Sequence, residues 1–375
     1  MKETTQTAVD QNTIRRRSTG LRAYNPEKAF RGYTLFAPLV GQSTVYLIDM
    51  EGEVVHQWKL PYPPAQYGYL LPNGNLLYNG QIPESPCRFP LWSLFQGGVV
   101  LEAEPSGKIV WEYYHPDHHH DARRLRNDNT MVLCIEKIPS WLVPQVKGGV
   151  PGTEINGDMY ADVLYEVNPA GEIIWTWHAW EHLDTETDII LLQEHRQEWT
   201  HANTVDELSD GNIVACFRNI STVMIIDRQT RKIVWKLGYN VLAQPHVPNE
   251  LPNKNLLIFD NGQHRQNEAV NYSRVIEIDR QTKEIVWEYK DDPAQNFYSP
   301  YLSGAQRLPN GNTLITEGSF GRMFEVTTAT GEVVWEYVSP YFGKRTVSAE
   351  TKLMCGEYNS VFRAFRYAPE EIPWL

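Results

Sequence analysis

A short phrase recurs six times along the chain: a tight turn containing glycine or Gln-Thr, two β-branched residues, and a tryptophan. The repeated tryptophans are spaced 48 to 64 residues apart; they are Trp58, Trp111, Trp175, Trp235, Trp287 and Trp335. A repeat of this length that holds several short strands is typical of a β-propeller blade, because one four-stranded sheet cannot bury both faces until neighbouring sheets stack against it around an axis. The sequence therefore predicts an all-β protein, a six-bladed β-propeller with four-stranded blades.

A second repeat alternates with the first. In five places a leucine leads through a turn such as Asn-Gly or Asp-Gly into an apolar strand, at residues 71 to 79, 125 to 133, 208 to 216, 251 to 259 and 308 to 316. Such dipeptides supply the positive φ angles that two-residue hairpins need. Both short turns of a blade then lie at one end of the propeller. The long connections emerge at the other end, where loops on a rigid scaffold usually carry function.

The sixth blade has to be assembled from both ends of the chain. Residues 32 to 60 supply three strands, and residues 360 to 367, SVFRAFRY, supply one alternating strand. Pairing the N-terminal with the C-terminal strand closes the ring and removes exposed sheet edges. We therefore expect one propeller domain over residues 25 to 375, preceded by a flexible N-terminal arm over residues 1 to 24.

Charge and composition exclude several classes of partner. The formal net charge of −12 argues against nucleic acid and anionic membranes. No apolar run is long enough to cross a membrane, and the first residues lack the apolar core of a secretory signal, so we expect a cytoplasmic protein. The four cysteines have no C-x-x-C spacing and are interpreted as buried small residues. The sequence leaves a homodimer open.

Histidines occur at matching places in several blades. His120 and His246 lie five residues before the leucine of the second repeat, and His201 lies seven before it. Equivalent positions of different blades converge near the axis, at the mouth of the central channel. Arg218 ends the second strand of its blade, and Asn203 lies on the same side of its strand as His201. We expect these five side chains to meet at one point.

Aromatic residues on the long loops suggest the class of substrate. Trp92, Trp141 and Trp199 would line a pocket for a small aromatic ligand, although such rings also serve to pin long loops. His119 competes with its neighbour for the place that faces the axis and is a second candidate to contact the substrate. Residues 184 to 197 begin with a helix cap and carry an apolar stripe, which predicts a short helix over the mouth.

Four segments carry a family resemblance: HHHDARRL, EWTHANTV, the FRN that follows a strand, and QPHV followed by LLIFDNG. In this order they resemble the arylsulfotransferase family, the bacterial nucleotide-independent aryl-sulfate sulfotransferases. The resemblance implies a six-bladed propeller that transfers a sulfuryl group from a phenolic sulfate ester to a phenolic acceptor through a histidine intermediate in the central channel, without a cofactor. His246 would match the nucleophile, and the groups that hold the sulfuryl oxygens would be His120, His201, Asn203 and Arg218. No acid follows His246 in QPHV to orient its ring.

Two other functions fit the same residues. Imidazoles from His119 or His120, His201, His246 and His264 could bind a transition metal such as Zn, Cu or Fe in a hydrolase, lyase or oxygenase. Arg218 argues against that interpretation, because it would repel a cation in the cluster. The other alternative is a non-catalytic propeller that binds partners across its face, for which an axial group of histidines and an arginine is not needed.

Overall fold

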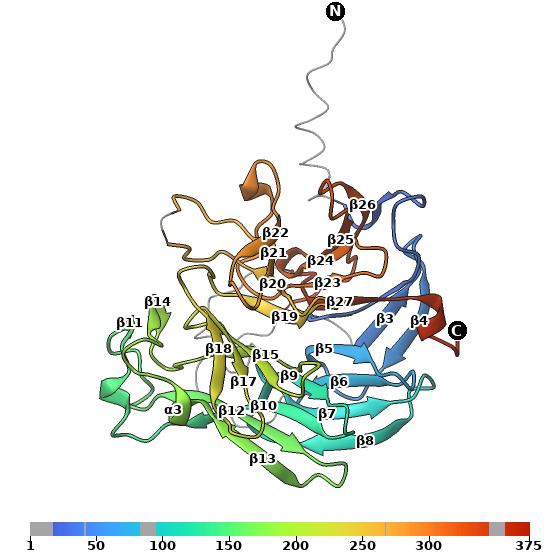
Figure 1. The fold of residues 1–375 in the computed structure, drawn as a ribbon. Helices are drawn as coiled ribbons and strands as arrows, with labels where there is room; N and C mark the ends of the chain where they lie inside the picture. The colour runs from blue at the N-terminus through green and yellow to red at the C-terminus, as the bar shows by residue number, and fades with distance from the viewer. Residues whose placement is uncertain (1–17, 41–42, 83–94, 267, 345–356) are drawn as a thin grey trace, which may run out of the picture.

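The two repeats of the sequence form the hairpins of six antiparallel four-stranded blades arranged as a ring, one of which is extended by a fifth strand (Figure 1). The computed structural model describes residues 18 to 40, 43 to 82, 95 to 266, 268 to 344 and 357 to 375. Within these residues the prediction of an all-β, six-bladed propeller with four-stranded blades is confirmed.

Four blades follow one another along the chain, each beginning with its innermost strand. The first two contain β5 (Pro64–Leu70), β6 (Leu76–Gln81), β7 (Gly98–Ala103) and β8 (Ile109–Tyr114), then β9 (His118–Arg124), β10 (Thr130–Lys137), β12 (Tyr160–Val167) and β13 (Ile173–His178). The third and fourth contain β15 (Ala202–Glu207), β16 (Ile213–Phe217), β17 (Thr222–Ile226) and β18 (Ile233–Leu237), then β19 (His246–Glu250), β20 (Leu256–Asp260), β21 (Arg274–Ile278) and β22 (Ile285–Tyr289).

The last two blades use residues from both ends of the chain. The fifth contains β23 (Gly304–Arg307), β24 (Thr313–Glu317), β25 (Arg322–Val326) and β26 (Val333–Val338), and the sixth contains β27 (Val361–Tyr367), β2 (Tyr33–Pro38), β3 (Thr44–Ile48) and β4 (Val54–Lys59). Strands β27 and β2 pair antiparallel, with Tyr367 opposite Tyr33. Each innermost strand contacts the innermost strands of both neighbouring blades, and β27 contacts β5.

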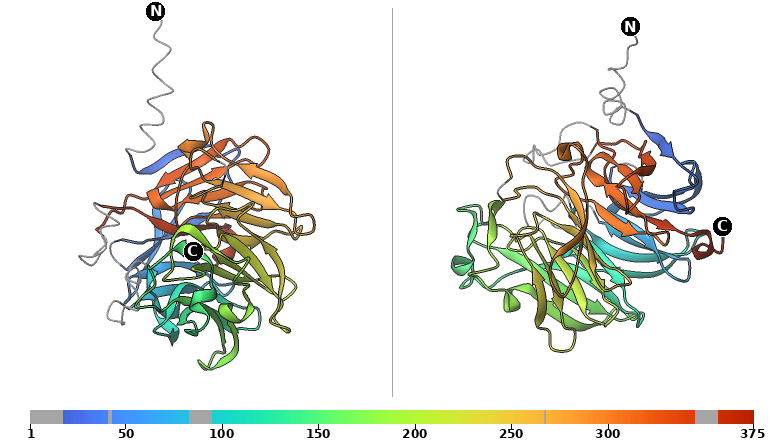
Figure 2. Two further views of the ribbon diagram at one scale, coloured as in Figure 1. Left: turned by 90° about the vertical axis from the view of Figure 1, so that its left-hand side faces the viewer. Right: turned by 45° about the horizontal axis from the view of Figure 1, so that its top comes forward.

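The N-terminal arm differs from the expectation. Residues 20 to 24, which the sequence analysis assigned to the arm, form strand β1 (Gly20–Tyr24) and pair antiparallel with β26. Figure 2 shows this first strand, in blue, beside the orange and red strands of the fifth blade. The outermost strand of a blade has an unpaired edge, and β1 covers that edge in the fifth blade.

The repeated tryptophan joins each blade to the next. In every blade its indole Nε1 donates a hydrogen bond of 2.8 to 3.1 Å to a backbone carbonyl in the outer turn of the following blade. For the six tryptophans taken in sequence order, beginning with Trp58 in the sixth blade, the acceptors are the carbonyl oxygens of Glu104, Pro169, Arg228, Arg280, Thr328 and Met50. The bond from Trp335 to Met50 spans 285 positions of the sequence and links the C-terminal part of the chain to its N-terminal part.

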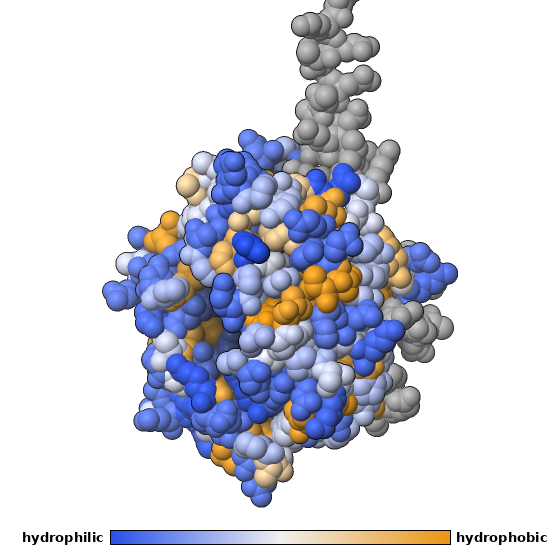
Figure 3. Space-filling model, turned by 90° about the vertical axis from the view of Figure 1, so that its right-hand side faces the viewer, coloured by the Kyte–Doolittle hydropathy of each residue, from blue (hydrophilic) through white to orange (hydrophobic). Residues whose placement is uncertain are grey.

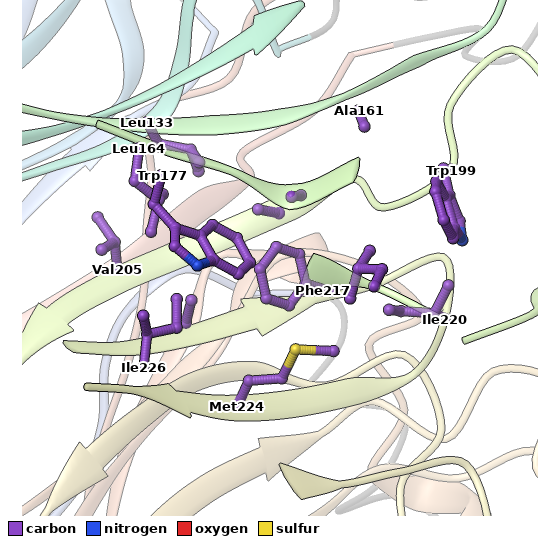
Figure 4. Close-up of a cluster of buried hydrophobic side chains, with 14 of the residues drawn as sticks. Leu133, Ala161, Leu164, Trp177, Trp199, Val205, Phe217, Ile220, Met224 and Ile226 are labelled. Atoms are coloured by element: carbon purple, nitrogen blue, oxygen red, sulfur yellow. The ribbon is translucent and has the colours of Figure 1, made fainter. Parts of the chain in front are cut away.

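Hydrophobic side chains fill the spaces between blades. The cluster between the second and third blades contains Trp177, Trp199 and Phe217, all of them fully buried (Figure 4).

Polar residues predominate on the face shown in Figure 3, where apolar residues form small separate patches. Among the described residues, no helix is both long and apolar enough to cross a membrane.

The long connections, at the end of the propeller opposite the short hairpin turns, contain short elements of their own. These are the 3-10 helices η1 (Val143–Gln145), η2 (Ala294–Asn296) and η3 (Gly318–Phe320), the helix α3 (Ala179–His182), and the parallel strands β11 (Gly148–Val150) and β14 (Ile190–His195); η4 (Pro369–Glu371) follows the last strand. The predicted helix over residues 184 to 197 is wrong, because β14 pairs with β11. Gly148 makes this approach possible: a Cβ there would lie 1.9 Å from the carbonyl oxygen of Ile190.

The bond that links the two ends of the chain can be tested with Trp335→Phe. The substitution removes the Nε1 donor and part of a fully buried ring, so we expect the free energy of unfolding to fall by about 2 kcal/mol. Urea denaturation followed by tryptophan fluorescence measures it. Trp141→Phe is the control, because that side chain is 64% exposed and its replacement should change stability by less than about 0.5 kcal/mol. Equal effects of the two substitutions would contradict a role of the indole bond.

Candidate active site

Three histidines from consecutive blades meet at the ends of the innermost strands. His120 lies within β9, His201 directly precedes β15, and His246 begins β19. The imidazole centroids of His120 and His201 are 4.9 Å apart, and both rings contact Phe95, at 4.9 and 4.7 Å. The ring of Phe362, on β27, lies 6.1 Å from His120 and 6.0 Å from His246. The structure thus brings the three predicted histidines together around the axis.

The backbone is strained where these histidines occur. His120 and His201 have φ angles of 52° and 51°, and Val247, next to His246, has a φ angle of 49°. Left-handed conformations of this kind cost a residue other than glycine roughly 1 to 3 kcal/mol, and outside turns they cluster at active sites. The pairing of β9 with β10, β15 with β16 and β19 with β20 also shifts register near these places. Such bulges re-aim side chains, here towards the axis.

Each axial imidazole uses its Nδ1 atom for a bond to a protein partner. Nδ1 of His246 lies 2.7 Å from Oδ1 of Asn261, and Nδ1 of His201 lies 2.6 Å from Oε2 of Glu198. Nδ1 of His120 lies 2.7 Å from Nδ1 of His119. In all three rings Nε2 is the nitrogen that remains for a substrate.

The bonds of Asn261 determine which nitrogen of His246 carries the proton. The Nδ2 amide group of Asn261 donates to the carbonyl oxygens of Ser299, at 2.7 Å, and Leu302, at 3.0 Å. Its Oδ1 atom is therefore an acceptor, so Nδ1 of His246 is the donor and Nε2 keeps its lone pair. Burial, followed by the nearby positive charge of Arg218, lowers the pKa of His246 to about 3, so the imidazole is neutral at neutral pH.

Arg218 lies beside this group but is already paired. It follows β16, and its Nη1 donates to Oε2 of Glu194 at 3.2 Å. The other carboxylate oxygen of Glu194 accepts a bond from Nε2 of Gln244 and lies 3.8 Å from Nε2 of His264. Burial raises the pKa of Glu194, but the charge of Arg218 and the bond from Gln244 outweigh it and hold the pKa below its usual value. Glu194 is therefore an anion within the site.

A cavity of about 250 Å³ opens at this place. Its walls include Glu194, Glu198, His201, Arg218 and His264, whereas His246 is not part of its lining. His246 is 2% exposed. The side chain of His201 is 12% exposed and is the most accessible of the axial imidazoles.

Asn203 supports the backbone around His246. Its Nδ2 donates to the carbonyl oxygen of Pro245 at 2.8 Å, and its Oδ1 accepts a bond from the Thr204 hydroxyl at 2.9 Å. The Thr204 oxygen in turn accepts from the backbone N–H of Val247 at 3.1 Å. Both neighbours of His246 are thereby held, so the contacts of Asn203 are those of a positioning residue.

Arg363 is a charged residue of the channel that the sequence analysis did not single out. It lies on β27 and is 1% exposed, and its Nη2 donates to Asn203 O and Thr204 Oγ1, both at 3.2 Å. Nη1 lies 3.5 Å from Oδ2 of Asp121, and the guanidinium lies 4.2 Å from the ring centre of Tyr67. The sequence SVFRAFRY could have indicated this residue, because an innermost strand is buried on both faces and the arginines on it must be buried as well.

The remaining candidates are spread over different environments. His119 lies behind His120, with Nε2 3.0 Å from Oδ1 of Asp162. Trp199 belongs to the hydrophobic cluster and Trp141 is exposed, so neither lines the cavity, and Trp92 lies outside the described residues. Within the described part of the chain, no group of three or more His, Cys, Asp or Glu side chains is arranged to hold a metal ion.

Comparison with known proteins agrees with this architecture. Among solved structures, a protein of unknown function from Bacteroides caccae superimposes with a TM-score of 0.54 at 12% identity, over 90% of this chain and 99% of that one, which bears on the fold alone. A catalytically inactive virginiamycin B lyase from Staphylococcus aureus, determined with quinupristin, gives a TM-score of 0.47 at 12% identity, over 86% and 89% of the two chains. No curated protein matches the sequence. The family model Arylsulfotransferase (ASST) matches residues 33 to 353, most of the chain. The chain belongs to the arylsulfotransferase family.

Proposed function

We propose that the protein transfers a sulfuryl group from a phenolic sulfate ester to a phenolic acceptor, with His246 as the group that carries it in between. The observation that carries this proposal is the bonding of His246. Asn261 holds its proton on Nδ1, and the imidazole is neutral, so Nε2 has a free lone pair at neutral pH. A neutral imidazole is a competent nucleophile, and the N–S bond that it forms is easily broken again.

Positive charge near Nε2 suits the transition state of this reaction. Sulfuryl transfer, like phosphoryl transfer, spreads negative charge over three oxygens, so catalysis consists of positioning and of donors aimed at that charge. Arg218 and Arg363 both act electrostatically on His246. Losing one donor of this kind typically costs roughly 3 to 4 kcal/mol of transition-state stabilisation. The proposal requires no metal or cofactor, because the two guanidinium groups supply the positive charge.

The donor has to displace Glu194 from Arg218. The carboxylate of Glu194 is bound to the guanidinium that would receive the sulfate, and two anions cannot share that place. When the donor enters, the sulfate replaces the carboxylate as the partner of Arg218. Glu194 lies on β14, which forms a two-stranded sheet with β11 outside the six blades, so the exchange would take place on a connection and not within a blade.

His246→Ala tests the nucleophile. With 4-nitrophenyl sulfate as donor and phenol as acceptor, we expect nitrophenol release to fall at least about 1,000-fold, because no covalent intermediate can form. Mass spectrometry of the wild-type protein should find one added sulfuryl group on His246. His178→Ala is the matched control, since that half-buried imidazole is bonded to Glu136 outside the site. Full activity of His246→Ala, or an adduct elsewhere, would reject this role of His246.

Asn261→Asp tests the neutral state of His246. In the wild type we expect protonation of His246 to cause no loss of the rate of adduct formation until the pH falls below about 4, because the pKa of His246 is about 3. A carboxylate in place of the amide favours the imidazolium, so the substitution should move the loss of activity to higher pH by roughly 1 to 3 units. The measurement is single-turnover adduct formation as a function of pH. Identical profiles of the two proteins would contradict the proposed control by Asn261.

Glu194→Gln tests the competition for Arg218. Removing the negative charge should lower the KM for 4-nitrophenyl sulfate about 5- to 20-fold, which corresponds to roughly 1 to 2 kcal/mol of lost repulsion. Steady-state kinetics at low ionic strength measures the change. The control is Glu186→Gln, which alters an exposed carboxylate of the same connection and should leave the KM unchanged. A raised KM in Glu194→Gln would mean that Glu194 holds Arg218 for the donor instead of competing with it.

A further inference from the structure

The partners of the axial histidines differ in charge. His246 is bonded to a neutral amide, whereas Oε2 of Glu198 lies 2.6 Å from Nδ1 of His201. A carboxylate at Nδ1 stabilises the imidazolium that forms when Nε2 takes up a proton, while an amide carbonyl carries no such charge. The contacts of the two imidazoles thus suit different tasks, with His201 the better placed to exchange a proton at Nε2.

The backbone around Glu198 is held on several sides. Its carbonyl oxygen accepts a bond from Nδ2 of Asn219 at 3.1 Å, and its backbone forms a bridge with Tyr160. The next residue, Trp199, donates through Nε1 to the carbonyl oxygen of Asp188 at 2.6 Å from within the hydrophobic cluster. The side chain of Glu198 is 4% exposed, and in the described part of the chain no residue bonds its Oε1 atom. Its one side-chain hydrogen bond therefore goes to His201.

The position of His201 suits proton transfer at the mouth of the site. It lines the 250 Å³ cavity together with Arg218, and it is more exposed than His246. Its Nδ1 is taken by Glu198, and no bond to Nε2 is formed by the described residues. A phenolic oxygen bound in the cavity would meet Nε2 of His201, which lines it, while the sulfur would face Nε2 of the more buried His246.

We propose that His201 is the proton donor and acceptor of the reaction and that Glu198 is its positioning residue. This inference rests on the proposed sulfuryl transfer and assigns a second histidine to it. In the first step, Nε2 of His246 forms a bond to sulfur, and the bond between sulfur and the aryl oxygen breaks with its electron pair on that oxygen. The oxygen takes the proton from Nε2 of His201, so a phenol leaves, and His201 is neutral beside the charged Glu198.

The second step reverses these transfers with a different phenol. The acceptor oxygen gives its proton to Nε2 of His201 and forms a bond to sulfur. The bond between sulfur and His246 breaks, and its electron pair returns to Nε2. The new sulfate ester leaves with one negative charge, and His201 is again an imidazolium paired with Glu198. No oxidant, reductant or further proton source is needed in the cycle.

The test compares two donors, because a proton donor matters most for a poor leaving group. Phenolate is far more basic than 4-nitrophenolate, so it depends more on receiving a proton as the bond to sulfur breaks. For Glu198→Gln we expect adduct formation on His246 to slow about 100-fold with phenyl sulfate and less than about 10-fold with 4-nitrophenyl sulfate. Glu198→Asp, which restores a carboxylate, should recover part of the rate with phenyl sulfate.

A matched control exists in the second blade. Glu136 lies 2.6 Å from Nδ1 of His178, so Glu136→Gln removes the same kind of contact outside the site. It should leave the ratio of the two donor rates unchanged. If Glu198→Gln slows both donors by the same factor, the role of Glu198 is structural and the inference is overturned, while the proposed function stands.

A wild-type measurement keeps the inference testable even where Glu198→Gln does not fold. With proton donation, the wild-type rate of adduct formation should depend only weakly on the basicity of the leaving phenol across a series of substituted phenyl sulfates. A steep dependence would overturn the inference. If the wild type forms no adduct with any donor, the proposed function fails, and this assignment fails with it.

Discussion

The six indole hydrogen bonds between blades are the constraint on which the site depends. Each one ties the outer strand of a blade to the outer turn of the next, and the series returns to its starting blade. Their regular geometry keeps the blades at fixed angles, so the innermost strands meet around one axis. As a result, imidazoles from three blades lie near the axis, with ring centroids 4.7 to 6.1 Å from Phe95 or Phe362, each of which contacts two of them.

The three axial imidazoles differ chemically because the partners of their Nδ1 atoms differ. His120, His201 and His246 have comparable places in their blades, and all are bonded through Nδ1. The partners differ in charge: Asn261 offers an amide oxygen to His246, and Glu198 offers a carboxylate oxygen to His201. Burial and the positive charge of Arg218 lower the pKa of His246 and keep it neutral, and Asn261 determines which of its nitrogens carries the proton. The strained φ angles at these residues are a local cost that the rigid ring of blades can support.

Sequence patterns predicted those features that depend on local properties of the chain. The turns and tryptophans repeat because each blade needs the same hairpins and the same indole bond, and His120, His201 and His246 could be brought together because equivalent positions converge. The partners Asn261 and Glu198 depend on side-chain bonds across loops, which no repeat encodes. The strand β14 was predicted as a helix because its pairing with β11 depends on Gly148, some 40 residues earlier in the chain.

The carboxylate bound to Arg218 bears on how an acidic chain could bind the proposed anionic substrate. A bare guanidinium in a largely enclosed site would carry an uncompensated charge, which is costly away from water. Glu194 removes that cost in the structure. Under the proposed function a sulfate would take the place of the carboxylate as the partner of Arg218, so that the guanidinium is paired with an anion both before and after binding. A net charge of −12 is compatible with such a site, because Arg218 would act on the sulfate at short range, whereas more distant surface charges are screened by salt.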